Sequence, residues 1–164
     1  MLRRALTWLV PESNPSRTVF GLITVGALLA AESGIHDTYA ETIGSVTIAL
    51  FVYWFAHAYS DLLGTRLASR ARLDWGLVLG SFAHEWAIIK GAALPLVALV
   101  VAGAAGAPQE TAVAAAVWTS VFGLIAFELA AGVLAGARRR ELIVDGVVGA
   151  IMGVGILALR AVVH

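Results

Sequence analysis

The chain contains no cysteine, and this absence excludes disulfide bonds, thiolate metal sites and cysteine nucleophiles. Charge is also scarce, because Asp, Glu, Lys and Arg make up only 13% of the 164 residues, roughly half the share typical of soluble domains. The formal net charge is zero, so the composition gives no reason to expect a nucleic-acid partner. Apolar residues make up 60% of the chain. A soluble core of this size would not absorb that excess, so we expect lipid to surround most of the protein.

Motifs that identify common enzyme and channel classes are absent as well. His84 and Glu85 are followed by Trp-Ala-Ile and lack the second histidine of a zinc-protease HExxH motif. The chain has neither a GxSxG nucleophile turn nor a phosphate-binding P-loop. A glycine-rich selectivity-filter loop like that of potassium channels is also missing. The sequence therefore does not predict an enzyme.

The basic residues that are present have a very uneven distribution. All of them except Lys90 and Arg160 fall into three clusters, which are Arg3, Arg4 and Arg17, then Arg66, Arg70 and Arg72, and then Arg138, Arg139 and Arg140. The clusters alternate with long apolar runs, and the intervening turns on the other side contain neither Lys nor Arg. This pattern follows the positive-inside rule for a chain that crosses a bilayer five times. It predicts a cytoplasmic N-terminus and an outer C-terminus.

The apolar runs predict an all-α fold, a polytopic transmembrane helical bundle that forms a single domain over residues 1–164. We expect membrane spans at about 15–33, 42–63, 86–105, 110–136 and 142–163. Residues 74–85 are amphipathic and are predicted to form an interfacial helix that leads into the third span. Joined to that span, they would make a helix too long for the bilayer unless it tilted strongly.

Three pairs of glycines stand four residues apart, at Gly76/Gly80, Gly132/Gly136 and Gly149/Gly153. Small residues at this spacing let helix backbones approach closely within a membrane. Packing within one chain and association between chains both remain open from the spacing alone. Because five helices make a thin bundle, we expect a homo-oligomer.

Several ionisable residues fall at membrane depth, where an ionised side chain costs at least ~2.5–3.5 kcal/mol. The predicted topology places six of them in the cytoplasmic third of the membrane: His57, Asp61, His84, Glu85, Lys90 and Glu128. His57 and Asp61 are four residues apart and share a helical face with Tyr53. The six residues belong to three different spans, so we expect them to converge.

This predicted cluster supports three interpretations. Carboxylates and imidazoles exchange protons near neutral pH, so a proton or cation pathway would use His57, Asp61, Glu128, His84, Glu85 and Tyr53. The same chemistry suits a divalent metal such as Zn, Mn or Fe, held by His57, Asp61, His84, Glu85 and Glu128, and two histidines suit haem. The third interpretation is a polar network that only fixes helix packing in a structural or accessory membrane subunit. The first is favoured, and no cofactor is the simplest expectation.

Two further surface features bear on membrane contacts. Arg138, Arg139 and Arg140 are predicted to face anionic lipid headgroups, in addition to setting orientation. The outer turns carry acids and no basic residue, so they would concentrate cations near an outer opening. An acidic excess there also follows simply from the exclusion of Lys and Arg, which is the preferred explanation.

The segment FVYWFAHAYSDLLGTRL, residues 51–67, combines aromatic residues, an Ala-His pair and an acid within one span. Together with the later segment ALPLVAL, residues 93–99, it resembles uncharacterised small integral membrane proteins of actinobacteria. The resemblance implies a multi-pass protein of a bacterial cytoplasmic (inner) membrane. It implies no activity, so it assigns no catalytic residue.

Overall fold

The computed structural model describes residues 15–31, 38–70 and 73–163, and within these ranges the chain is helical without any strand. The predicted all-α class is therefore confirmed. In chain order the helices are α2 (Pro15–Ala31), α3 (Tyr39–Ser69), α4 (Trp75–His84), α5 (Trp86–Ala104), α6 (Gln109–Leu134) and α7 (Arg139–Val163). The basic residues Arg3, Arg4 and Arg72, and the outer acids Glu32 and Asp37, lie outside the described residues.

Four helical segments are long and apolar enough to cross a membrane: α3, the combined stretch Trp75–Ala104, α6 and α7. The chain is thus a helical membrane protein. Helix α2 is apolar too, but its 17 described residues make it shorter than the other four. The fifth crossing and the cytoplasmic N-terminus stay predictions.

Local sequence explains where two of the helices begin. The Thr38 side chain accepts a hydrogen bond from the Glu41 backbone N–H, and the Glu41 carboxylate accepts one from the Thr38 N–H, which makes a capping box for α3. Asp74 caps α4 by accepting a hydrogen bond of 2.7 Å from the Leu77 N–H.

Helix α3 extends beyond both ends of the predicted span 42–63. Its 31 residues correspond to about 46 Å, which exceeds the ~30 Å of the hydrocarbon layer. The helix ends at Arg70, which adopts the left-handed conformation with φ 51°. Hydropathy marks only the part of a helix that lipid covers, so the polar last turns of α3 were not predicted as span.

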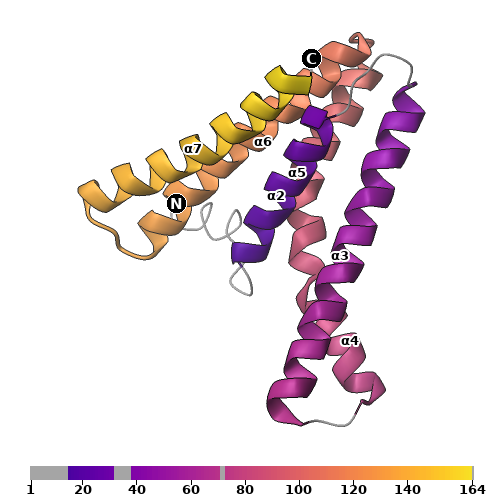
Figure 1. Cartoon of the computed structure of the whole chain (residues 1–164). Coiled ribbons are helices and arrows are strands. Elements are labelled where there is room, and N and C mark those ends of the chain that lie inside the picture. Colours follow the sequence, from indigo (N-terminus) through magenta and orange to yellow (C-terminus); the bar gives the residue numbers. More distant parts are fainter. Residues whose placement is uncertain (1–14, 32–37, 71–72, 164) are drawn as a thin grey trace.

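Helix α2 lies among α5, α6 and α7, as Figure 1 shows, and its contact with α5 is especially close. A Cβ at Gly21 would overlap the backbone carbonyl oxygen of Ile88, and a Cβ at Gly91 would overlap that of Thr18. Backbones can approach this closely only where both helices lack a side chain at the contact. The buried apolar core around it is formed by Leu22, Val25, Leu29, Val46, Leu50, Ile88, Leu99, Val117 and Leu124.

Helices α6 and α7 form a hairpin whose packing uses three of the glycines spaced four apart. A Cβ at Gly149 would lie 3.2 Å from the Ile125 Cα, and one at Gly153 would press on Val121. Gly132 likewise lies against the side chain of Asp145. These glycines therefore serve packing within one chain, whereas Gly76 and Gly80 meet no other helix.

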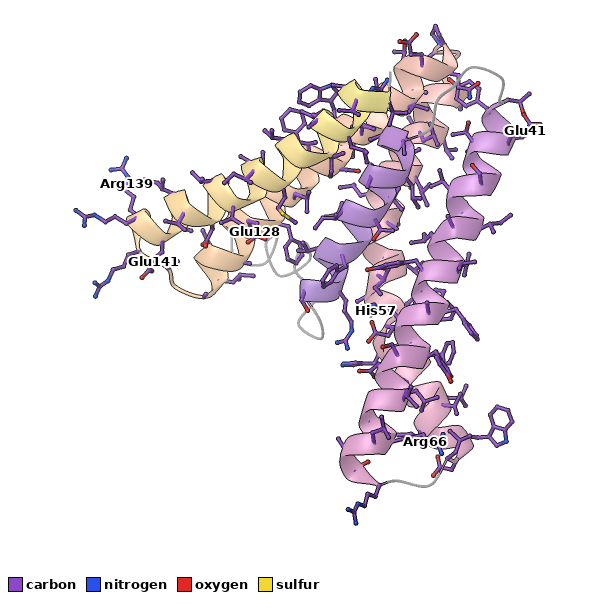
Figure 2. All side chains as sticks on the ribbon, in the orientation of Figure 1. Glu41, His57, Arg66, Glu128, Arg139 and Glu141 are labelled. Atoms are coloured by element: carbon purple, nitrogen blue, oxygen red, sulfur yellow. The ribbon has the colours of Figure 1, made fainter. Side chains whose placement is uncertain are left out.

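The bundle is joined at one end and spread at the other. Figure 1 shows the α6–α7 hairpin and the α3–α4 arm diverging from the end that holds the α5–α6 turn. At the joined end the Tyr39 hydroxyl donates to the Ala107 carbonyl (2.5 Å), and the Gln109 side-chain amide donates to Thr42 (2.9 Å). Figure 2 shows Arg66 at the far end of α3 and Arg139 at the α6–α7 turn, so the basic clusters lie on separate arms.

Candidate functional site

Glu85 is the single residue between helices α4 and α5. It is the C-cap residue of α4 and the N-cap residue of α5, and its N–H donates to the Ser81 carbonyl (3.1 Å). Its side chain is 0% exposed. A fully buried carboxylate requires charged or hydrogen-bonding partners, so the neighbours of Glu85 define the candidate site.

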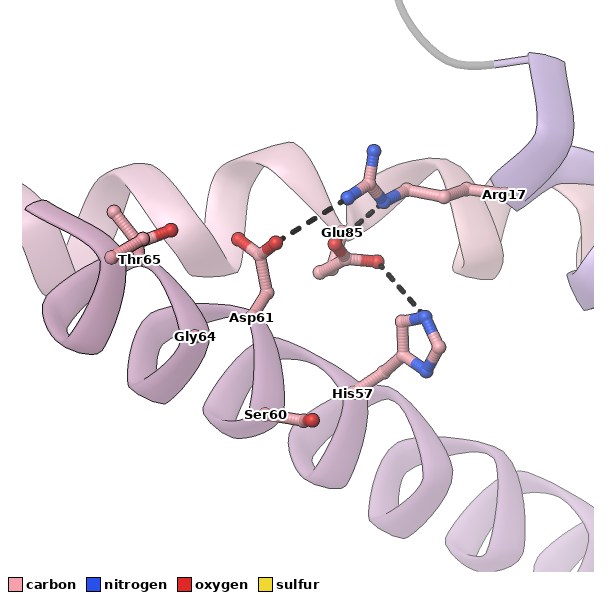
Figure 3. A pocket seen from close by; sticks show the side chains of 8 residues that line it. Arg17, His57, Ser60, Asp61, Gly64, Thr65 and Glu85 are labelled. Atoms are coloured by element: carbon pink, nitrogen blue, oxygen red, sulfur yellow. Dashed lines mark hydrogen bonds and ion pairs between the residues drawn. The ribbon is translucent and has the colours of Figure 1, made fainter.

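Arg17, in the first turn of α2, supplies the principal partner. Its Nε donates to Glu85 Oε1 at 2.5 Å, and its Nη1 donates to His84 Nε2 at 2.8 Å. A guanidinium has no acceptor, so His84 Nε2 accepts that bond and carries no hydrogen there. Arg17 Nη2 also lies 3.7 Å from Asp61 Oδ1 on α3 (Figure 3). One side chain thus links α2, α3 and the α4–α5 junction.

The close contact between α2 and α5 explains why Arg17 reaches Glu85. Gly91 sits against the Thr18 backbone, directly beside Arg17, and Gly21 sits against Ile88 of α5. This contact draws the first turn of α2 down onto the first turns of α5. The local backbone packing therefore aims Arg17 at the helix junction.

The second oxygen of Glu85 faces a histidine without bonding to it. His57 Nε2 lies 3.9 Å from Glu85 Oε2, which is too long for a hydrogen bond. Glu85 Oε2 is buried and has no hydrogen-bond partner in the described part of the chain. The His57 ring is itself held by Tyr53, on which it stacks at a centroid distance of 5.7 Å.

A pocket of about 490 Å³ opens beside these groups. It is lined by Arg17, His57, Ser60, Asp61, Gly64, Thr65, Ala68 and Glu85. Along α5, Glu85 lies about 29 Å from Ala104, at ~1.5 Å per residue. That distance is close to the ~30 Å thickness of the hydrocarbon layer.

The structure brings together four of the residues predicted to converge: His57, Asp61, His84 and Glu85. Tyr53 joins them through its ring contact with His57. Arg138, Arg139 and Arg140 are exposed at the α6–α7 turn. Their contact with lipid headgroups stays a prediction.

Glu128 and Lys90 do not join this cluster, which corrects the expected convergence. Glu128 of α6 lies beside Gly149 of α7, and Asp145 of α7 lies beside Gly132 of α6, so both acids belong to the α6–α7 contact. Figure 2 shows Glu128 and His57 on different arms of the molecule. Lys90 is exposed on α5. The sequence predicts the depth of these residues in the membrane. It does not predict which neighbouring helix their side chains face, and α6, which carries Glu128, diverges from α3.

Sequence reasoning missed one residue of the site, Arg17, and one acid outside it, Asp145. Arg17 was interpreted as a topological signal only, although it follows Pro15 and therefore lies inside the first helix. Its position at the same end as Asp61 and Glu85 was the available signal. Asp145 was overlooked, although an acid within a predicted apolar span is expected to need a partner.

The five residues proposed as metal ligands are not arranged as a metal site. Among the described residues, no group of three or more His, Asp or Glu side chains is close enough to hold a metal ion. Arg17 explains this, because its guanidinium occupies the space between Glu85, His84 and Asp61. Glu128 is on another arm, and His84 Nε2 is bonded to Arg17, which argues against haem ligation through that nitrogen.

No protein-family model, curated protein or solved structure matches the chain. The resemblance to small actinobacterial membrane proteins therefore stays a prediction.

Proposed function

We propose that this membrane protein takes up and releases protons or small cations at the site formed by Glu85, His57 and Asp61. The observation that carries the proposal is the state of Glu85. Its carboxylate is fully buried, one oxygen is bound to Arg17, and the other lies 3.9 Å from His57 Nε2 without a hydrogen bond. A buried acceptor beside an imidazole is a place where a proton or cation gains a hydrogen bond or an ion pair.

The charges of the site residues favour the binding of one additional positive charge. Arg17 carries one positive charge, while Asp61 and Glu85 carry two negative charges when both are ionised. With both imidazoles neutral, the net charge is −1. One proton or one monovalent cation would neutralise it. We place the pocket that admits this ion at the level of the lipid headgroups, because Glu85 directly precedes the membrane-crossing helix α5.

The route across the membrane is constrained by the apolar core. Between the pocket and the α5–α6 turn, the interior is filled by side chains such as Val25, Leu50, Leu99 and Val117. An ion does not cross such a region without polar partners. We therefore propose that transport across the inner membrane uses a path between copies in a homo-oligomer, with the pocket as its cytoplasmic entrance and lipid around the assembly.

Reconstituted liposomes test this function directly. Proton and potassium flux would be measured with the wild type, with Glu85→Gln, and with Glu110→Gln, a matched control that is exposed at the other end of the bundle. We expect flux in the wild type and in Glu110→Gln, and at least about tenfold less in Glu85→Gln. Wild-type flux equal to that of empty vesicles under every gradient would exclude the proposal.

A structural or accessory role is the second candidate, because Arg17 ties three parts of the bundle together. In that case the site fixes helix packing and handles no ion. His57→Ala would then lower the thermal stability of the protein in detergent, while no variant would change a transport signal.

A further inference from the structure

We propose that the Glu85 pocket binds a primary ammonium group, from either a small free amine or an aminophospholipid headgroup. This inference rests on the proposed function, because it names the class of cation that the same site takes. It starts from the buried Glu85 carboxylate, which lines the pocket and whose Oε2 has no hydrogen-bond partner in the described chain.

The size of the pocket points to a molecule larger than a proton or a water. Its volume of about 490 Å³ is far above the ~30 Å³ occupied by one water and falls in the ~300–1,000 Å³ range of small-molecule sites. Gly64, on the side of the pocket formed by α3, leaves open space there, since even a Cβ at this position would meet no atom within 4 Å. A relay that passes only protons does not require such space.

The hydrogen-bonding groups match an ammonium. A primary ammonium carries three N–H donors and no acceptor. Glu85, Asp61 and His57 line the pocket, and their carboxylates and imidazole are groups that can accept such hydrogen bonds. Asp61 is 3.7 Å from Arg17, so it forms an ion pair but no hydrogen bond there. Figure 3 shows Asp61, Glu85 and His57 approaching one another from α3 and the α4–α5 junction.

Charge separates this ligand class from metals and from quaternary amines. The Arg17 guanidinium lies within the site and repels a divalent cation more strongly than a monovalent one. A quaternary ammonium has no N–H to donate to the unpartnered oxygen of Glu85. A monovalent cation with hydrogen-bond donors fits both the net charge of −1 and the free acceptors.

The free-amine arm of the test uses purified protein in detergent and follows thermal unfolding by the fluorescence of its five tryptophans. Ethylammonium chloride is titrated against tetraethylammonium chloride at equal ionic strength. We expect ethylammonium alone to raise the Tm. Its apparent affinity should fall at least about tenfold in Glu85→Gln and in Asp61→Asn, and should be unchanged in Glu110→Gln.

The lipid arm repeats the titration in nanodiscs of phosphatidylglycerol, with and without phosphatidylethanolamine. If the source is a lipid, phosphatidylethanolamine raises the Tm of the wild type but not of Asp61→Asn, and added ethylammonium contributes little more. If the source is a free amine, ethylammonium raises the Tm equally in both kinds of disc.

Two outcomes would overturn the ammonium site: no Tm increase from either source, or an equal increase with tetraethylammonium. Asp61→Asn keeps the test decisive if Glu85→Gln fails to fold, because the Asp61 side chain is 35% exposed. Flux that depends on Glu85, without any ammonium effect, would reject the ammonium site alone. Ammonium binding without flux would instead reject the proposed transport function.

Discussion

Arg17 Nε lies 2.5 Å from Glu85 Oε1, and this ion pair joins the first turn of α2 to the junction of α4 and α5. The carboxylate is fully buried, and the arginine side chain is 18% exposed. The pair therefore holds its two charges largely away from water, where the loss of one partner costs far more than the loss of both.

Arg17→Met should accordingly be strongly destabilising, by about 3–5 kcal/mol, because it leaves the Glu85 charge without its main partner. The double variant Arg17→Met/Glu85→Leu should recover most of that loss. Thermal unfolding in detergent measures both, with Arg139→Met at the exposed α6–α7 turn as control. A double variant as unstable as the sum of its single variants would show that the two residues act independently.

Gly91→Ala should separate α2 from α5. The new Cβ would overlap the Thr18 carbonyl, so the backbones must move apart, at a cost of about 1–3 kcal/mol. Gly44→Ala is the matched control, because a Cβ at that position in α3 meets nothing within 4 Å. The two variants should differ clearly in Tm, and a Gly91→Ala protein as stable as Gly44→Ala would contradict the contact.

Glu128→Gln should leave the α6–α7 hairpin folded, because it replaces a carboxylate beside Gly149 of α7 with a neutral side chain of similar size. Thermal unfolding in detergent checks this, and we expect no decrease in Tm. The same substitution should leave flux through the Glu85 site unchanged, because Glu128 lies on another arm. Reduced flux at unchanged stability would instead place Glu128 on the ion pathway.

Tyr39→Phe should loosen the joined end of the bundle. It removes the hydrogen bond from the Tyr39 hydroxyl to the Ala107 carbonyl, which is worth about 1 kcal/mol. Tyr59→Phe makes the same chemical change on a side chain that is 56% exposed, and it should have little effect. Hydrogen exchange at the α5–α6 turn should increase in the first variant only, and equal exchange in both would count against this role for Tyr39.

The helical class could be read from the sequence because apolar runs and basic clusters report directly on the solvent around each segment. The junction at Glu85 also lies where amphipathic periodicity ends and a continuous apolar run begins. The length of α3 was underestimated because its last turns, up to Ser69, are polar, and hydropathy does not mark polar turns as part of a span.

The candidate site was only partly predictable. His57 and Asp61 share a face because of their spacing, and Glu85 has a similar depth, so these residues could be grouped from sequence. The exclusion of Glu128 and the inclusion of Arg17 depend on how helices pack. In particular, the Gly21 and Gly91 contact turns Arg17 toward α5, and no periodicity within one helix contains that information.

At the headgroup level that we propose for it, the pocket would lie within the electrical double layer of the membrane. A cytoplasmic leaflet with a surface potential of roughly −30 mV concentrates monovalent cations about threefold at its surface. Cations would therefore reach Asp61 at a higher activity than in bulk solution, and the anionic lipid content of the membrane would set the occupancy of the site even if its intrinsic affinity stayed constant.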